Sequence, residues 1–156
     1  MALEQCIKFV ETVASSTEME LLMESPKSSP LIFSPQMTPP DYERFCALQL
    51  RKAGWDARVT QASNDQGCDV IAVKSGRKLV VQCKFYSSSV GNSAVQEISA
   101  SRLHERADFA AVVSNAAFTK PALRLANTNN VMLMHHDQLS HVDRQIIALT
   151  VLTSST

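Results

Sequence analysis

The sequence predicts an α/β domain in which helices flank a central mixed β-sheet, with elements in the order αβββαβαβ. Two segments rich in Val and Ile, at 68–73 and 78–85, are separated by a short Gly-containing turn, which is typical of a β-hairpin. Two further apolar segments, at 108–114 and 131–134, alternate with helical segments, which indicates parallel strands joined by crossover helices. With 156 residues, 45% of them hydrophobic, the chain is long enough for one domain with a core.

The first 40 residues differ in composition from the rest. Residues 1–23 repeat apolar positions at helical spacing, which predicts a helical appendage. Residues 24–40 contain five of the six prolines. Because proline lacks a backbone donor and restricts the dihedral angles, we expect a linker there. The main domain is expected over 41–156.

Composition also bears on compartment and partners. The 15 Lys and Arg balance the 15 Asp and Glu, so any site for a polyanion must be local. The four cysteines lack the spacing of a metal site and no signal peptide is evident, so we expect reduced thiols in a cytoplasmic protein. No apolar run approaches the roughly 20 residues that a membrane span needs, and no membrane association is expected.

The first element of the domain is predicted to be a helix with Asp41 as its N-cap and Gly54 just past its end. Apolar residues such as Phe45 and Leu50 gather on one face, and Glu43 falls at the margin of that face. A half-buried functional carboxylate would occupy such a position. The alternative is a surface glutamate favoured in the first turn by the helix dipole.

The register of the hairpin follows from its turn. If residues 75–76 form a two-residue loop, Lys74 faces Arg77, and Asp69 then lies directly across from Gln82. Directly opposed residues have Cβ atoms roughly 5 Å apart. The register therefore predicts that this carboxylate and this amide meet.

The same strand brings a lysine to the pair. Side chains alternate along a strand, so Gln82 and Lys84 share one face and Cys83 points to the other. Carboxylate, amide and carbonyl oxygens are ligands suited to Mg²⁺ or Mn²⁺, and a lysine ammonium can orient a water for attack on phosphorus. The alternative is that Asp69 closes a turn while the other two decorate an exposed hairpin face.

Later segments complete the predicted architecture. A helix is expected over 92–106 and another over 119–129, where Pro121 occupies its permitted first turn. Thr119 precedes that helix and is expected to be its N-cap, although backbone N–H groups there could also receive a phosphate. The segment at 145–152 predicts a core or interface strand, or a short helix.

Two other kinds of site are not expected. His135 and His136 are adjacent near the end of the predicted strand, with His141 close by, but adjacent strand residues point to opposite faces. No carboxylate or cysteine spacing was found that would complete a zinc site with them. The chain also lacks a Gly-rich phosphate loop, so no nucleotide cofactor is expected.

An ordered set of motifs makes this sequence similar to a known family. From about Pro40 to Leu139 it resembles the Mrr-type restriction endonuclease domain, a branch of the PD-(D/E)xK nuclease superfamily in which glutamine often replaces the second acidic residue. The motifs that carry the resemblance are "DxGxD" at Asp65, Gly67 and Asp69, "QxK" at Gln82 and Lys84, and "VG...AVQE" from Val90 to Glu97.

The resemblance implies a restriction-endonuclease-like core and a role for each matching residue. Asp69 matches the metal-binding aspartate, Gln82 takes the place of the second acidic ligand, and Lys84 matches the catalytic lysine. The backbone carbonyl of Cys83 would complete the metal shell, and Glu43 matches a helix glutamate that serves a second metal or a bridging water. The implied cofactor is Mg²⁺ or Mn²⁺.

The implied partner is DNA. Gln96 matches a position that is commonly polar in the family, and Arg102, Lys120 and Thr119 are further candidates for DNA contact. We expect a metal-dependent endonuclease of restriction type, acting on foreign DNA or as a DNA-degrading toxin, and a homodimer if both strands are cut. The alternatives are a Holliday-junction or repair nuclease on the same fold and a catalytically weak DNA-binding module.

Overall fold

The structure is a computed structural model that describes residues 31–61 and 67–155. The helix expected within 1–23 lies outside the described residues, as do residues 24–30 of the expected linker and Asp65. Residues from Ile32 onward form one compact unit.

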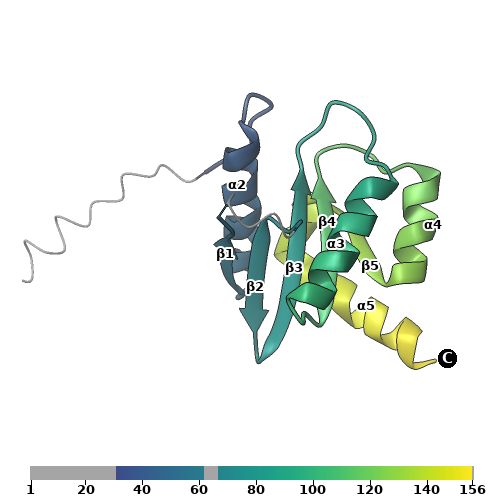
Figure 1. Cartoon of the computed structure of the whole chain (residues 1–156). Helices are drawn as coiled ribbons and strands as arrows, with labels where there is room; N and C mark the ends of the chain where they lie inside the picture. The colour runs from purple at the N-terminus through teal and green to yellow at the C-terminus, as the bar shows by residue number, and fades with distance from the viewer. Residues whose placement is uncertain (1–30, 62–66, 156) are drawn as a thin grey trace, which may run out of the picture. The chain divides into compact units, whose positions relative to one another are not determined.

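The observed elements follow the predicted order (Figure 1). The five strands form one sheet in the order β1-β2-β3-β4-β5, in which the first two pairings are antiparallel and the last two are parallel. The predicted α/β class with a central mixed sheet is confirmed. In chain order the elements are α2 (Pro39–Lys52), β1 (Asp56–Val59), β2 (Val70–Lys74), β3 (Arg77–Lys84), α3 (Asn92–His104), β4 (Phe109–Ser114), α4 (Lys120–Asn129), β5 (Val131–His135), the 3-10 helix η1 (His136–His141) and α5 (Val142–Ser154).

The predicted hairpin register is confirmed from the turn as far as Val70. Lys74 pairs with Arg77 and Val70 pairs with Val81, but the pairing ends there, and the Asp69 N–H donates to the Val81 carbonyl, one residue out of that register. The loop residues Ser75 and Gly76 both have positive φ, at 52° and 74°. Two consecutive residues with positive φ make a turn whose twist matches that of the strands, so the two-residue loop sets the register.

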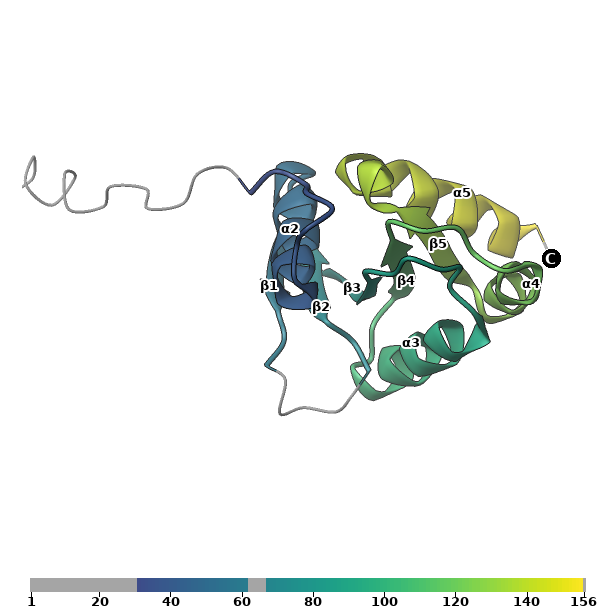
Figure 2. The same cartoon turned by 90° about the horizontal axis from the view of Figure 1, so that it is seen from above.

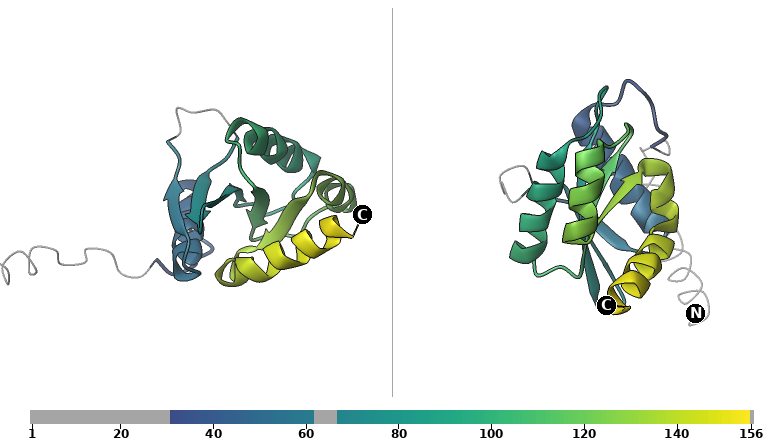
Figure 3. Two further views of the ribbon diagram at one scale, coloured as in Figure 1. Left: turned by 90° about the horizontal axis from the view of Figure 1, so that it is seen from below. Right: turned by 90° about the vertical axis from the view of Figure 1, so that its right-hand side faces the viewer.

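Helices cover both faces of the sheet (Figure 2). On one face, α3 and α4 lie side by side (Figure 3) and bury Val95, Ile98 and Ala126 against strand residues such as Val80 and Val112. On the other face, α2 packs against the first three strands and against η1. The crossover helices α3 and α4 each join a parallel pair of strands, as predicted.

The start of α2 differs from the prediction. Thr38, and not Asp41, is the N-cap, and its side chain accepts a hydrogen bond from the Asp41 backbone N–H at 3.3 Å. Pro39 and Pro40 form the first helical positions, where a missing N–H costs no intrahelical bond. At the other end Gly54 has φ 85° and follows the helix, as predicted.

The segment at 145–152 belongs to helix α5, so the helical alternative is correct and the strand alternative is wrong. This helix buries Val142 and Ile146. Its more distal apolar residues Ile147, Val151 and Leu152 are exposed. Among the described residues, no helix combines the length and apolarity that crossing a membrane demands.

Candidate active site

Asp69 lies just before β2 and is held by backbone hydrogen bonds to residues of two other segments. Its N–H donates to the Val81 carbonyl at 2.8 Å, and its carbonyl accepts from the Thr60 N–H at 2.8 Å. The carboxylate Oδ2 accepts from the Cys83 N–H at 2.7 Å. Asp69 is therefore fixed between the ends of β1 and β3.

Gln82 and Lys84 share one face of β3, as the alternation predicts. Both reach the same carboxylate on α3, because Gln82 Nε2 donates to Glu97 Oε2 and Lys84 Nζ lies 3.3 Å from that oxygen. Cys83 points to the opposite face, where its thiol contacts that of Cys46 on α2; this contact and burial raise the pKa of Cys83 well above its ordinary value.

The contact with Glu97 orients the amide of Gln82. A carboxylate accepts hydrogen bonds and cannot donate them, so Glu97 selects the Nε2 end of the amide. Gln82 is only 4% exposed, and its Oε1 has no hydrogen-bond partner among the residues that the structure describes. A buried acceptor without a partner is costly, so this oxygen has the environment expected of a ligand to a cation.

Burial and a neighbouring negative charge raise the pKa of two carboxyl groups near this site, those of Asp69 and Glu43. Burial raises the pKa of Asp69, and the Glu97 charge adds to this, while the Cys83 N–H and the Lys84 ammonium oppose it. Burial also raises the pKa of Glu43 on α2, with a second contribution from the Asp69 charge. Carboxylates that repel one another in a partly buried site favour a bound cation.

The oxygen donors near the end of β3 fit Mg²⁺ or Mn²⁺. In an extended strand the N–H and C=O of one residue point to the same side, so the Cys83 carbonyl faces Asp69 as its N–H does. Asp69, the Gln82 amide oxygen and this carbonyl are all hard ligands. The geometry therefore admits the ligand set that the resemblance implies.

The sequence-based candidates did not include Glu97. The residue chosen there was its neighbour Gln96, which is exposed and lies about 100° further round the helix. Glu97 closes the "AVQE" motif, and that was the signal that could have identified it. Its position against β3 depends on how α3 packs, which strand alternation does not reveal.

Gly67 lets the chain leading to Asp69 lie against α3. It has φ 73°, and a Cβ built on it would lie 2.9 Å from Ser101 Oγ and 3.3 Å from the Glu97 carbonyl oxygen. Any other residue at this position would therefore be costly, because of both the backbone conformation and the limited space. The "DxGxD" glycine serves the packing of the site.

The other DNA-contact candidates lie away from these groups or have structural partners. Arg102 donates to the Asn130 carbonyl at 3.2 Å and links the ends of α3 and α4. Thr119 is the N-cap of α4, as expected, and accepts from the Ala122 N–H at 3.2 Å. Lys120 is exposed.

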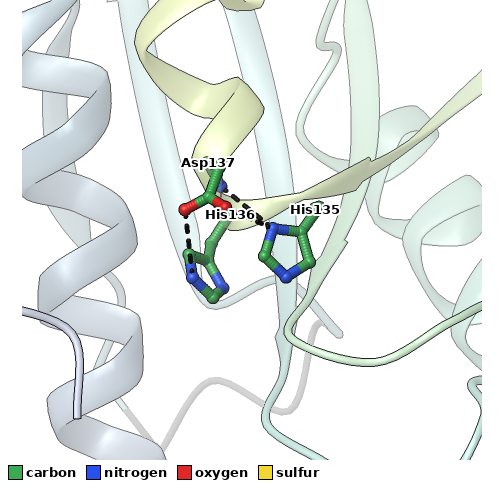
Figure 4. A group of neighbouring side chains, drawn as sticks. All are labelled: His135, His136 and Asp137. Carbon is green, nitrogen blue, oxygen red and sulfur yellow. Dashed lines mark hydrogen bonds and ion pairs between the residues drawn. The ribbon is translucent and has the colours of Figure 1, made fainter.

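The expectation that His135 and His136 point to opposite faces is wrong. Strand β5 ends at His135 and η1 begins at His136, so strand alternation does not extend to the second histidine. The turn brings both imidazoles to the carboxylate of Asp137 (Figure 4). Contrary to the expectation, the carboxylate of Asp137 joins the two histidines in one group.

The mixed sheet, with Asp69, Gln82 and Lys84 gathered near the end of its central strand β3, places the protein in the class of restriction-endonuclease-like α/β folds. A family model described as restriction endonuclease, Mrr_cat, matches residues 35–142. The chain belongs to this Mrr-type restriction endonuclease family, which confirms the resemblance. No curated protein sequence matches the chain significantly.

Solved structures with a similar fold were also found. A protein of unknown function, AF1548, has a TM-score of 0.52 at 18% identity, over 60% of this chain and 57% of its own. Protein VC1899 from Vibrio cholerae has a TM-score of 0.50 at 13% identity, over 69% and 32%. The restriction endonuclease MspJI, solved in complex with a 27-mer oligonucleotide, has a TM-score of 0.44 at 24% identity, over 72% and 30%. The chain thus spans between 30% and 57% of the length of these proteins.

Proposed function

We propose that the protein is a Mg²⁺- or Mn²⁺-dependent DNA endonuclease that hydrolyses phosphodiester bonds, acting in the cytoplasm in defence against foreign DNA or as a DNA-degrading toxin. The observation that supports this most directly is the buried amide oxygen of Gln82, which lacks a hydrogen bond among the described residues while Glu97 holds the amide nitrogen. Family membership supports the nuclease activity.

In this proposal Asp69, the Gln82 amide oxygen and the Cys83 carbonyl hold the cation, and Glu43 serves a second cation or a bridging water. A divalent cation supplies charge neutralisation at the scissile phosphate and makes water more acidic. Asp69 gains from this arrangement because burial otherwise disfavours its charge.

Lys84 is proposed to orient the attacking water and to place positive charge near the phosphorus. Its side chain is 19% exposed and its ammonium lies 3.3 Å from Glu97, which limits its freedom. An ammonium held in place needs little reorganisation when charge develops on the phosphate oxygens.

Glu97 is proposed to replace the charge that is lost when glutamine takes the place of the second acidic ligand. Its carboxylate contacts the amide of Gln82 directly, so one negative charge remains next to the cation site. It also directs the neutral amide oxygen toward the cation. On this view Gln82 is a functional ligand held by Glu97.

Plasmid cleavage with Mg²⁺ or Mn²⁺ tests this proposal. Asp69→Ala and Lys84→Ala should each abolish cleavage, whereas the exposed controls Asp56→Ala and Lys52→Ala should retain it. Cleavage that survives both site changes would refute the assignment. DNA binding without cleavage by any form would instead favour the binding module, and preference for a four-way junction over a duplex would favour a repair nuclease.

We further propose a homodimer, because one active site per chain cuts one strand at a time. The exposed apolar residues Ile147, Val151 and Leu152 on α5 are candidates for its interface. Light scattering on the full chain tests this: a dimer that Val151→Glu converts to a monomer is expected, and a monomer at all concentrations would contradict it.

A further inference from the structure

A second group of potential ligands lies at the end of β5. His135, His136 and Asp137 are consecutive, and their ligand atoms all lie within 4.8 Å of one another (Figure 4). One carboxylate oxygen of Asp137 lies 3.1 Å from His135 Nδ1, and the other lies 3.3 Å from His136 Nε2. The break between β5 and η1 thus creates a convergent set of two nitrogens and a carboxylate.

His136 is held rigidly in this group. It is 4% exposed, and its Nδ1 lies 3.2 Å from the hydroxyl of the buried Tyr42 on α2. Phe33 stacks on its ring with centroids 4.3 Å apart. A hydrogen bond at one imidazole nitrogen fixes the direction of the other, which is how metal-binding histidines are commonly oriented.

The three side chains are close enough to share one cation. The Asp137 carboxylate faces both imidazoles, with Oδ2 near His135 Nδ1 and Oδ1 near His136 Nε2. Imidazole nitrogens and a carboxylate oxygen are donor atoms that transition-metal ions bind together.

The surroundings leave room for further ligands. The three residues line a cavity of about 700 Å³ together with Tyr86, Ser87 and Asn115, among others. Water or a substrate oxygen could therefore fill the remaining coordination positions, as in metal sites that have only three protein ligands.

We propose that His135, His136 and Asp137 bind a first-row transition-metal ion, of which Zn²⁺ is the probe of choice. Two imidazoles and one carboxylate suit Zn²⁺, Co²⁺ or Cu²⁺, whereas the all-oxygen set around Asp69 suits Mg²⁺. The sheet register aligns Lys84 with Ser114 and Ser114 with His135, so the two sites lie at the same end of the sheet but two strands apart.

Metal titration of the full chain tests the proposal without any DNA cleavage. The chain should contain Asp69→Asn, which removes the carboxylate of the oxygen site, and excess Mg²⁺ should be present. Calorimetry should show one Zn²⁺ bound per chain, and Asp137→Asn, at a side chain that is 78% exposed, should abolish that binding without unfolding the protein. Tyr42→Phe should weaken it about 10- to 100-fold by releasing His136.

Electron paramagnetic resonance of bound Cu²⁺ identifies the ligands. Coupling to two imidazole nitrogens is expected, with one lost in His135→Asn, while the exposed control His141→Ala should leave the spectrum unchanged. Three results would overturn the assignment. They are an equal Zn²⁺ affinity in the parent chain and in Asp137→Asn, no Zn²⁺ binding at all, and a Cu²⁺ spectrum typical of a thiolate ligand. Because neither measurement involves DNA, failure of the nuclease proposal would leave this one standing.

Discussion

Glu97→Gln is the sharpest perturbation of the proposed nuclease site. The substitution preserves the size of the side chain but removes its charge. Because an amide can both donate and accept, the variant no longer selects the Nε2 end of Gln82, and the Lys84 ammonium loses its ion pair. The ligand oxygen of Gln82 should then point correctly only part of the time.

The structure sets the size of the expected effect. Hydrogen bonds to charged groups contribute about 1.5–3 kcal/mol and neutral ones about 0.5–1.5 kcal/mol, so neutralising Glu97 costs about 1–1.5 kcal/mol at Gln82. The pair with Lys84 adds about 0–1 kcal/mol, because Glu97 is 45% exposed and solvent screens it. A total of about 1–2.5 kcal/mol corresponds to a roughly 5- to 70-fold loss in kcat/KM.

The assay is single-turnover cleavage of a duplex over a series of Mg²⁺ concentrations. Glu97→Gln should require more Mg²⁺ for half-maximal rate and should cleave more slowly at saturation. Gln96→Ala, at the exposed neighbouring position, is the matched control and should resemble the parent. Circular dichroism should confirm that both variants are folded.

Two results would refute this reasoning. If Glu97→Gln cleaves at the parental rate across the whole Mg²⁺ series, the carboxylate does not position Gln82. If Gln96→Ala causes an equal loss, the effect belongs to the surface of α3 in general and not to the contact with the amide.

Three further predictions concern stability. Burial raises the pKa of Asp69 above 3.8, so its charged form destabilises the metal-free fold. Asp69→Asn should therefore raise the melting temperature in EDTA at pH 7, and this gain should shrink toward zero as the pH falls below the pKa of Asp69 in the unfolded chain. A gain that is unchanged at low pH would show that the charge of Asp69 is not its cause. Gly67→Ala should destabilise the fold and slow cleavage, because its φ is 73° and the new Cβ would meet Ser101 Oγ at 2.9 Å; unaltered denaturant midpoints would contradict this. Thr38→Ala should remove the N-cap of α2 and lower the free energy of unfolding by about 1 kcal/mol, or the melting temperature by about 2–4 °C. If Asp41→Ala causes such a loss and Thr38→Ala causes none, Asp41 is the cap after all.

Local chemistry made much of the sheet predictable. The turn at 75–76 sets the pairing of β2 with β3, and period-two alternation then places Gln82 and Lys84 together. Both rules act over a few residues, so they hold before any packing is known. The same holds for the α4 cap at Thr119.

The errors fall where an element ends or where two distant elements meet. The prediction of Asp41 as the cap of α2 is wrong because Pro39 and Pro40 form the first turn of the helix, which places the cap at Thr38. The expectation that His135 and His136 point to opposite faces is wrong because strand alternation does not apply to His136, which begins η1 one residue past the end of β5. Alternation arguments fail at such boundaries because the backbone conformation changes within a single residue.

Turn geometry, periodicity and motif order are enough to predict the fold class, the pairing of β2 with β3 and the contact of Asp69 with the "QxK" strand. The groups that surround these residues depend on tertiary packing. The approach of α3 brings Glu97 to the Gln82 amide, and the packing of α2 against η1 brings Tyr42 to His136. Contacts between residues far apart in the chain depend on how whole helices pack on the sheet, and no local pattern specifies that.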